Sequence, residues 1–280
     1  MPFKIRVGTS GYSFKDWVGP IYPERLPQKE WLSYYAREFD TVEINSTYYR
    51  VPSPYMMAAL VRKVRPKEFV FVVKVPKEMT HERGKFDETV EPFLSGIQPM
   101  LDAGCLGSLL AQFPYSFKRR QESLRHLERL REAIPRDIPL HVEFRNEWWY
   151  RPEVFDFLRE HDLGFVNVDL PPLSGLPQEK TAIVTNGIGY FRFHGRNAAK
   201  WWDHEEAGER YDYLYSEQEL EEWIPAIQEA ASKAKLTFIF MNNCHRGKSA
   251  INAVQLQRRL DLREPEDRAA WEILERKLFG

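Results

Sequence analysis

The chain has 280 residues, of which 43% are hydrophobic and 29% are charged, so it can bury a core and global disorder is excluded. Lysine plus arginine (40) nearly balances aspartate plus glutamate (41), and the formal net charge of −1 excludes a generally basic nucleic-acid coat. The apolar runs are too short to span a bilayer, the N-terminal segment lacks a signal-peptide core, and there are two cysteines. We therefore expect a cytoplasmic protein without membrane contact.

Eight short segments rich in β-branched and aromatic residues predict strands. Stretches with helical signals separate most of them, including one opened by Ser53 and Pro54 and one opened by the capping pair Ser216 and Glu219. Residues 171–186 are rich in proline and glycine, which predicts an irregular sixth crossover. The predicted strands are Ile5–Thr9, Thr41–Asn45, Phe69–Val75, Leu106–Gln112, Leu140–Phe144, Gly164–Asp169, Tyr190–His194 and Thr237–Asn242.

Strands that alternate with helices predict βαβ units, a parallel sheet and right-handed crossovers. Eight such units in roughly 250 residues indicate an α/β fold of the (β/α)8 TIM-barrel type. An open doubly wound sheet is the rival, but the first turn, Gly8–Tyr12, lacks the G-x-G-x-x-G spacing typical of many such folds. We expect a single domain over residues 1–280, with the barrel over about 4–260 and a helical tail over 261–280.

Polar residues occupy one parity in most of the predicted strands. In the fifth strand, for example, Glu143 and Arg145 alternate with Val142 and Phe144. Because side chains alternate sides along a strand, we expect these polar groups to point into the barrel near the carboxyl ends of the strands, where barrel enzymes place their sites. The structural alternative is an internal ion-pair network that merely fills the barrel.

These positions predict one cavity with acid–base groups and ligand-binding groups. Arginine can hold phosphate or carboxylate through two parallel hydrogen bonds, amides can orient a ligand, and aromatic rings can stack on it or anchor loops. The predicted catalytic residues are Glu43, Glu143, Asp169 and His194. The residues predicted to bind substrate are Lys74, Arg145, Arg192, Asn45, Gln112, Asn242, Asn243, Tyr12, Tyr48 and Trp148.

The charges of this set bear on metals and anions. The bases Lys74, Arg145 and Arg192 would repel a divalent ion, and the sequence has no H-x-H, H-E-x-x-H or C-x-x-C motif, so we predict no metal and no cofactor. If the acids pair with all three bases, the cavity should prefer neutral polyols. If one base is left unpaired, an anion should bind, and we favour a small anionic ligand.

Seven segments resemble, in order, the motifs of the YecE-like family, a bacterial and archaeal domain of unknown function. The resemblance implies a TIM-barrel-like fold with a pocket, and it implies no settled activity. One departure is Cys244-His245, where a histidine or aromatic residue is expected after the paired asparagines. The segments are GTSGYSFKDWVGPIYP, FDTVEINSTYYRVPSP, FVVKVP followed by MTHER, LLAQFPYSF, HVEFRNEWW, YFRFHGR and MNNCHRGKSAINAVQL.

Three functions remain open from the sequence. The first is a metal-independent hydrolase or lyase that acts by acid–base chemistry on a small anionic, phosphorylated or sugar-bearing substrate. The second is a divalent-metal-dependent nucleic-acid phosphodiesterase, an idea that rests on analogy between barrel folds. The third is a protein that binds nucleic acid or a nucleotide without turnover, using rim aromatics and basic side chains.

Overall fold

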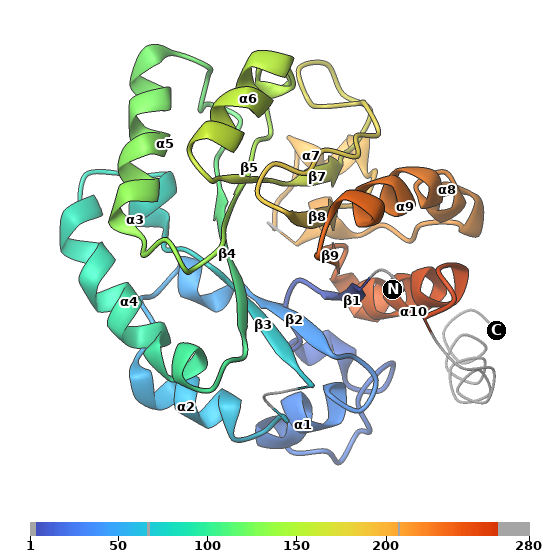
Figure 1. Ribbon diagram of the computed structural model, residues 1–280. Helices are drawn as coiled ribbons and strands as arrows, with labels where there is room; N and C mark the ends of the chain where they lie inside the picture. Colours follow the sequence, from blue (N-terminus) through green and yellow to red (C-terminus); the bar gives the residue numbers. More distant parts are fainter. Residues whose placement is uncertain (1–3, 66–67, 207, 263–280) are drawn as a thin grey trace.

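In the computed structural model, which describes residues 4–65, 68–206 and 208–262, the strands form an inner wall and the helices surround it (Figure 1). Each strand pairs with its neighbours in parallel, as the sequence predicts. The strands are β1 (Ile5–Thr9), β2 (Thr41–Ile44), β3 (Val70–Lys74), β4 (Leu106–Gln112), β5 (Leu140–Glu143), β6 (Gly164–Phe165), β7 (Asn167–Asp169), β8 (Ile188–Phe193) and β9 (Leu236–Met241).

Helices fill most of the crossovers on the outside of the wall. The predicted caps are confirmed: Ser53 accepts a hydrogen bond from the backbone N–H of Met56, and Ser216 and Glu219 form a reciprocal capping box. The helices are α1 (Trp31–Tyr35), α2 (Pro54–Val61), α3 (Lys77–Thr80), α4 (Phe86–Asp102), α5 (Gln121–Ala133), α6 (Pro152–Glu160), α7 (Ala198–Trp201), α8 (Glu217–Glu221), α9 (Ile224–Lys233) and α10 (Lys248–Arg259).

The sixth crossover, residues 170–187, contains neither helix nor strand, which confirms the prediction for this segment. The side chain of Asn167 holds it against the wall, because its amide donates to the Ile183 carbonyl and accepts from the Ile183 N–H and from Thr181. The predicted C-terminal helical tail lies almost entirely outside the described residues.

The predicted sixth strand is broken into β6 and β7 because its two halves have different partners. Gly164 and Phe165 pair with β5, whereas the residues from Asn167 to Asp169 pair with β8. Val166, at the break, donates its N–H to the Val142 carbonyl at 3.0 Å. One strand therefore joins a five-stranded sheet, β2-β3-β4-β5-β6, to a four-stranded sheet, β1-β9-β8-β7.

The other junction of the wall, between β1 and β2, depends on few contacts. A single parallel bridge links Ser10 to Glu43. The side chain of Arg6 donates to the backbone carbonyls of Asp40 and Glu68, and it pairs with the Asp40 carboxylate at 2.6 Å. At Gly8 the two strands lie so close that a Cβ atom would be 2.3 Å from the Thr41 carbonyl oxygen, so only glycine fits.

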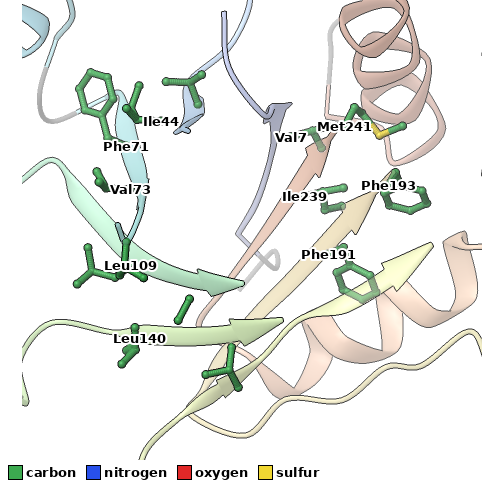
Figure 2. Close-up of a cluster of buried hydrophobic side chains, with 14 of the residues drawn as sticks. Val7, Ile44, Phe71, Val73, Leu109, Leu140, Phe191, Phe193, Ile239 and Met241 are labelled. Atoms are coloured by element: carbon green, nitrogen blue, oxygen red, sulfur yellow. The ribbon is translucent and has the colours of Figure 1, made fainter. Parts of the chain in front are cut away.

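Two apolar layers stabilise the wall. Side chains of one parity pack between the strands and the helices, and Figure 2 labels ten of them, from Val7 in β1 to Met241 in β9. The opposite parity fills the barrel interior with a smaller apolar cluster that includes Val72, Leu110 and Phe240. The polar residues of β2, β3, β4, β5 and β8 share this interior parity. No helix in the described parts of the chain is both long and apolar enough to cross a bilayer.

Candidate functional site

A cavity of about 490 Å³ lies at the carboxyl ends of the strands. Four of the predicted site residues line it: Lys74 at the end of β3, Gln112 at the end of β4, Arg145 after β5, and Tyr48 in the loop after β2. The lining has no carboxylate among the described residues. The other lining residues are Tyr49, His81, Pro114, Tyr115, Ser116, Trp201, Trp202, Arg210 and Tyr211.

Lys74 has neutral partners in this cavity. Its Nζ atom donates a 2.9 Å hydrogen bond to Gln112 Oε1 and lies 4.2 Å from the centroid of the Tyr48 ring. In the described chain, no carboxylate lies within ion-pair distance of Lys74. Desolvation, together with the positive charges of Arg192 and Arg145, lowers the pKa of Lys74 to about 7. The amine therefore exchanges protons in the neutral pH range.

Tyr211 is a second titratable group of the cavity wall. Burial by itself raises its pKa, but the neighbouring Arg145 guanidinium outweighs that effect and lowers the pKa of Tyr211 below its ordinary value. In contrast, burial raises the pKa of Tyr48 to about 12. Burial and the positive charges of Lys74 and Arg145 lower the pKa of His81 to about 4, so this ring is neutral at physiological pH.

Behind the lining, Arg192 links two carboxylates that are fully buried. Its Nη2 atom lies 2.7 Å from Glu43 Oε1, and its Nη1 atom pairs with Glu143 Oε2. Tyr190 donates a further hydrogen bond of 2.6 Å to Glu43. Burial opposes ionisation of Glu143, but the charge of Arg192 holds the pKa of that carboxyl well below its usual range. These three charged residues form an ion-pair network that the cavity lining covers.

Arg145 connects this network to the cavity. Its Nε atom lies 3.1 Å from Glu143 Oε1, while its side chain also lines the cavity. Its Nη2 atom and the Asn242 amide both point at Nδ1 of His194, at 3.5 and 2.9 Å. Since an arginine can only donate, Nδ1 accepts and the proton of His194 is on Nε2, which lies 3.3 Å from Glu143 Oε1. Burial lowers the pKa of His194 to about 3, so the ring is neutral.

The charges around the cavity bear on the preference for an anionic or a neutral ligand, which the sequence left open. Two carboxylates, Glu43 and Glu143, face three bases. Arg192 pairs with both carboxylates, and Arg145 pairs with Glu143. Lys74 is the base left without a carboxylate partner among the described residues. Arg210, at the cavity wall, stacks near Trp201 and contacts His204, and it adds another positive charge.

The structure corrects the predicted position of Asp169. Its side chain does not point into the barrel but to the helix side, where it accepts hydrogen bonds from Tyr215 at 2.6 Å and Trp223 at 2.9 Å and pairs with Arg196 at 2.7 Å. The valines on either side of Asn167 take the interior positions instead. The prediction was wrong because the neighbouring strands direct polar side chains into the barrel, whereas the sixth strand directs its valines inward and its polar residues outward.

Several other predicted binding residues also lie away from the cavity. Asn243 bonds to the Tyr213 carbonyl and to Asn252 on α10. Trp148 is 54% exposed, with Arg151 over its ring, and does not line the cavity. Tyr12 and Asn45 line a neighbouring, more apolar cavity of about 420 Å³, which also contains Tyr49. Glu43, Glu143, Arg192, His194 and Asn242 are buried behind the site rather than exposed in it.

The structure adds residues that the sequence analysis did not assign to the site. Tyr211 and Trp201 come from the loop after β8, and Arg210 precedes Tyr211. His81 follows Lys74 by seven residues, in the segment MTHER. The sequence signal that could have identified Arg210 as a site residue is its position directly before the aromatic residue Tyr211 in this loop. The described residues contain no group of three or more His, Cys, Asp or Glu side chains arranged to hold a metal ion.

A larger hollow of about 590 Å³ lies at the amino ends of β2 and β3, near Asp40, Arg65 and Glu68. Its charges are largely solvated: Arg65 and Glu68 pair at 3.3 Å with 84% and 68% of their side chains exposed. Ion pairs this exposed contribute little, whereas Lys74, His81 and Tyr211, whose pKa values are all lowered, together line the cavity at the carboxyl ends of the strands. We therefore take that cavity as the candidate site.

Comparison with known proteins supports the same fold and names a family. A solved DUF72 family protein of Thermotoga maritima is 44% identical, with 92% of this chain and 99% of that chain covered and a TM-score of 0.84. The curated UPF0759 protein YunF of Bacillus subtilis is 28% identical over 274 residues, which cover 92% of this chain and 95% of YunF. The UPF0759 protein YecE of Escherichia coli is 29% identical over 148 residues, about half of each chain.

Another solved structure matches at the level of the fold alone. A D-psicose 3-epimerase of Clostridium cellulolyticum is 10% identical, with 92% of this chain and 97% of that chain covered and a TM-score of 0.51. The barrel predicted from the sequence is thus confirmed, as is the resemblance to the YecE-like family. The family described as "Protein of unknown function DUF72" matches residues 6–273, and the chain belongs to this family.

Proposed function

We propose that this protein is a metal-independent enzyme that binds a small anionic substrate, phosphorylated or sugar-bearing, in the cavity around Lys74, and transforms it as a hydrolase or lyase. One observation carries the proposal: Lys74 is a cavity-lining base without a carboxylate partner in the described chain, beside an arginine that is already paired. The cavity therefore has a surplus of positive charge. An anion there gains charge-assisted hydrogen bonds of about 1.5–3 kcal/mol each.

The roles within the site follow from the geometry. Arg145 and Arg210 supply fixed positive charge for a phosphate or carboxylate group, because guanidinium stays protonated. Lys74 and Tyr211 supply proton transfer, since each has a pKa shifted toward neutrality. Glu43 and Glu143 hold Arg192 and Arg145 in place from behind the lining, and we no longer assign them proton transfer to the substrate.

Thermal unfolding in the presence of ligands tests the proposal. Phosphate, sulfate and dihydroxyacetone phosphate should raise the Tm of the wild type, and neutral dihydroxyacetone should not. Lys74→Met should abolish the shift. Lys77→Met removes a lysine three residues after Lys74 that pairs with Glu82, and it should keep the shift. Equal shifts in the wild type and Lys74→Met, or a response to neutral sugars alone, would overturn the anion site.

Exposed rings at the cavity mouth favour a second candidate function, binding of a nucleic-acid end. Tyr49 and Trp202 both line the cavity and are 76% and 55% exposed, as is typical of platforms on which bases stack. Fluorescence anisotropy with a single-stranded oligonucleotide that carries a 5′-phosphate tests it. This function predicts binding tighter than that of inorganic phosphate and a loss of that gain in Trp202→Ala; equal affinities would count against it.

A further inference from the structure

Lys74 differs from other lysines of the chain in what it contacts. Lys77, Lys200 and Lys248 each pair with a carboxylate, at 2.6, 3.1 and 2.5 Å. Lys74 instead donates to an amide oxygen, that of Gln112, and lies over the Tyr48 ring. An amide oxygen can accept a hydrogen bond from an ammonium or from a neutral amine, so this contact does not require the nitrogen to be charged.

The neighbourhood of Lys74 makes the neutral amine accessible near neutral pH, alongside the ammonium form that attracts an anion. Arg145 and Arg192 lie close enough to act on its charge, and desolvation adds to their effect, so the pKa of the amine falls to about 7. A lysine that is desolvated and next to other cations is the arrangement that makes a nucleophilic amine. With one N–H directed to Gln112, a neutral Lys74 keeps its lone pair available for a bound molecule.

The same cavity contains a proton donor and an anion site. Tyr211 lines it beside Arg145, whose charge lowers the pKa of the phenol. Imine formation needs such a group, because the oxygen of the carbonyl must leave as water and must receive protons to do so. Arg145 and Arg210 can hold the anionic end of the same molecule. The nucleophile, the proton donor and the groups that bind the anion therefore all line the same cavity.

We infer that Lys74 forms an imine with the carbonyl carbon of an anionic aldehyde or ketone, an inference that rests on the proposed anion site. The lone pair of Nζ adds to the carbonyl carbon, and the electron pair of the C=O bond goes to the oxygen, which takes up a proton. The nitrogen then loses a proton, the C–O bond breaks, and the oxygen departs with a second proton as water. The products are one C=N bond and one water molecule, with no change of oxidation state.

This step narrows the proposed reaction to a lyase. A protonated imine withdraws electrons from the neighbouring carbon, so a bond one position further along can break and leave its electron pair on the imine side. A hydrolase has no use for such an intermediate. The substrate class that follows is a small phosphorylated or carboxylated keto sugar or keto acid, small enough for a cavity of about 490 Å³.

Reductive trapping tests the inference on the full chain. Borohydride delivers hydride to an imine carbon and makes the link permanent, so protein treated with dihydroxyacetone phosphate gains the mass of that molecule less one oxygen atom. Peptide mass spectrometry should place the adduct on Lys74. The labelled fraction of the whole protein should be at least about tenfold higher than in Lys74→Arg, which keeps the charge but has no nucleophilic amine. Lys77→Met should be labelled like the wild type. Pyruvate serves as a carboxylate probe, and dihydroxyacetone should label at least about tenfold less than its phosphate.

The outcomes separate this inference from the anion site. If phosphate raises the Tm but borohydride traps no adduct with either anionic probe, the anion site stands and the imine is wrong. If the adducts map to surface lysines, or occur equally in Lys74→Arg, the imine is also wrong. If neither a thermal shift nor an adduct is seen, the anion site itself fails. The position of the adduct is read in the wild type, so that readout does not depend on how well the Lys74 variants fold.

Discussion

Lys74 Nζ donates a 2.9 Å hydrogen bond to Oε1 of Gln112, and this neutral contact between β3 and β4 takes the place where an ion pair would be expected. A carboxylate at position 112 would hold the lysine as an ammonium ion and would cancel its charge. The amide does neither. The state of Lys74, a cavity base without a carboxylate partner in the described chain and with a lowered pKa, therefore depends on this pair.

Gln112→Glu should convert the site into a neutral, internally paired one. The new carboxylate should raise the pKa of Lys74 by at least about one unit and should abolish the phosphate-induced rise in Tm. Thermal shift, and the pH dependence of borohydride trapping, measure the two effects. Gln218→Glu, at an exposed position of α8, adds the same charge elsewhere and should leave both unchanged. Retention of the full phosphate response in Gln112→Glu would contradict this account of the site.

Arg192→Met should destabilise the fold strongly. It leaves Glu43 and Glu143 buried without their shared partner, and breaking a buried ion pair in this way costs about 3–5 kcal/mol. Urea denaturation measures the loss. Arg65→Met removes an ion pair whose side chains are 84% and 68% exposed, and its cost should stay below about 1 kcal/mol. Similar losses in the two variants would show that the buried network does not stabilise the barrel.

Asp169→Asn should reduce stability without touching ligand binding. The substitution removes the charge that Arg196 pairs with and turns one acceptor into a donor beside Tyr215 and Trp223, at a cost of about 2–3 kcal/mol. The phosphate-induced rise in Tm should be as large as in the wild type, because Asp169 does not face the cavity. A lost phosphate response in a folded Asp169→Asn protein would restore the residue to the site.

Gly8→Ala should open the junction between β1 and β2. The added Cβ would lie 2.3 Å from the Thr41 carbonyl oxygen, a contact that backbone atoms cannot relieve without moving a strand. We expect a loss of about 1–3 kcal/mol in denaturation experiments. Gly208→Ala is the matched control, because its φ is −70° and, apart from its chain neighbours, no atom of the described residues lies within 4 Å of the new methyl group. That variant should be neutral or slightly stabilised.

The stability of the wild type relative to Lys74→Met should rise with pH. The pKa of Lys74 is near 10.5 when unfolded and about 7 when folded, so between these values the unfolded chain binds more protons at this position. Raising the pH through that window therefore favours the folded wild type, by up to about 1.4 kcal/mol per pH unit. Denaturant unfolding at about pH 6 and about pH 9 checks the sign. A difference between the two proteins that does not vary with pH would exclude a depressed pKa.

The order of strands and helices follows from the sequence alone. β-branched and aromatic runs, the caps at Ser53 and Ser216 and the proline-rich stretch 171–186 are local signals, and local signals suffice for a fold built of repeated βαβ units. Alternation along each strand likewise places Lys74 and Gln112 on the interior face at the carboxyl ends. These features need no knowledge of what lies opposite.

What a polar residue meets across the barrel is decided only by the tertiary structure. Arg192 finds Glu43 at a distance of 149 residues along the chain, and this pairing removes both from the cavity, whereas Lys74 meets an amide and keeps its charge available. Asp169 faces outward because its carboxylate there accepts hydrogen bonds from Tyr215 and Trp223 and pairs with Arg196. Parity is a property of a strand, but burial, pairing and pKa depend on partners that closure of the barrel brings together from distant parts of the chain.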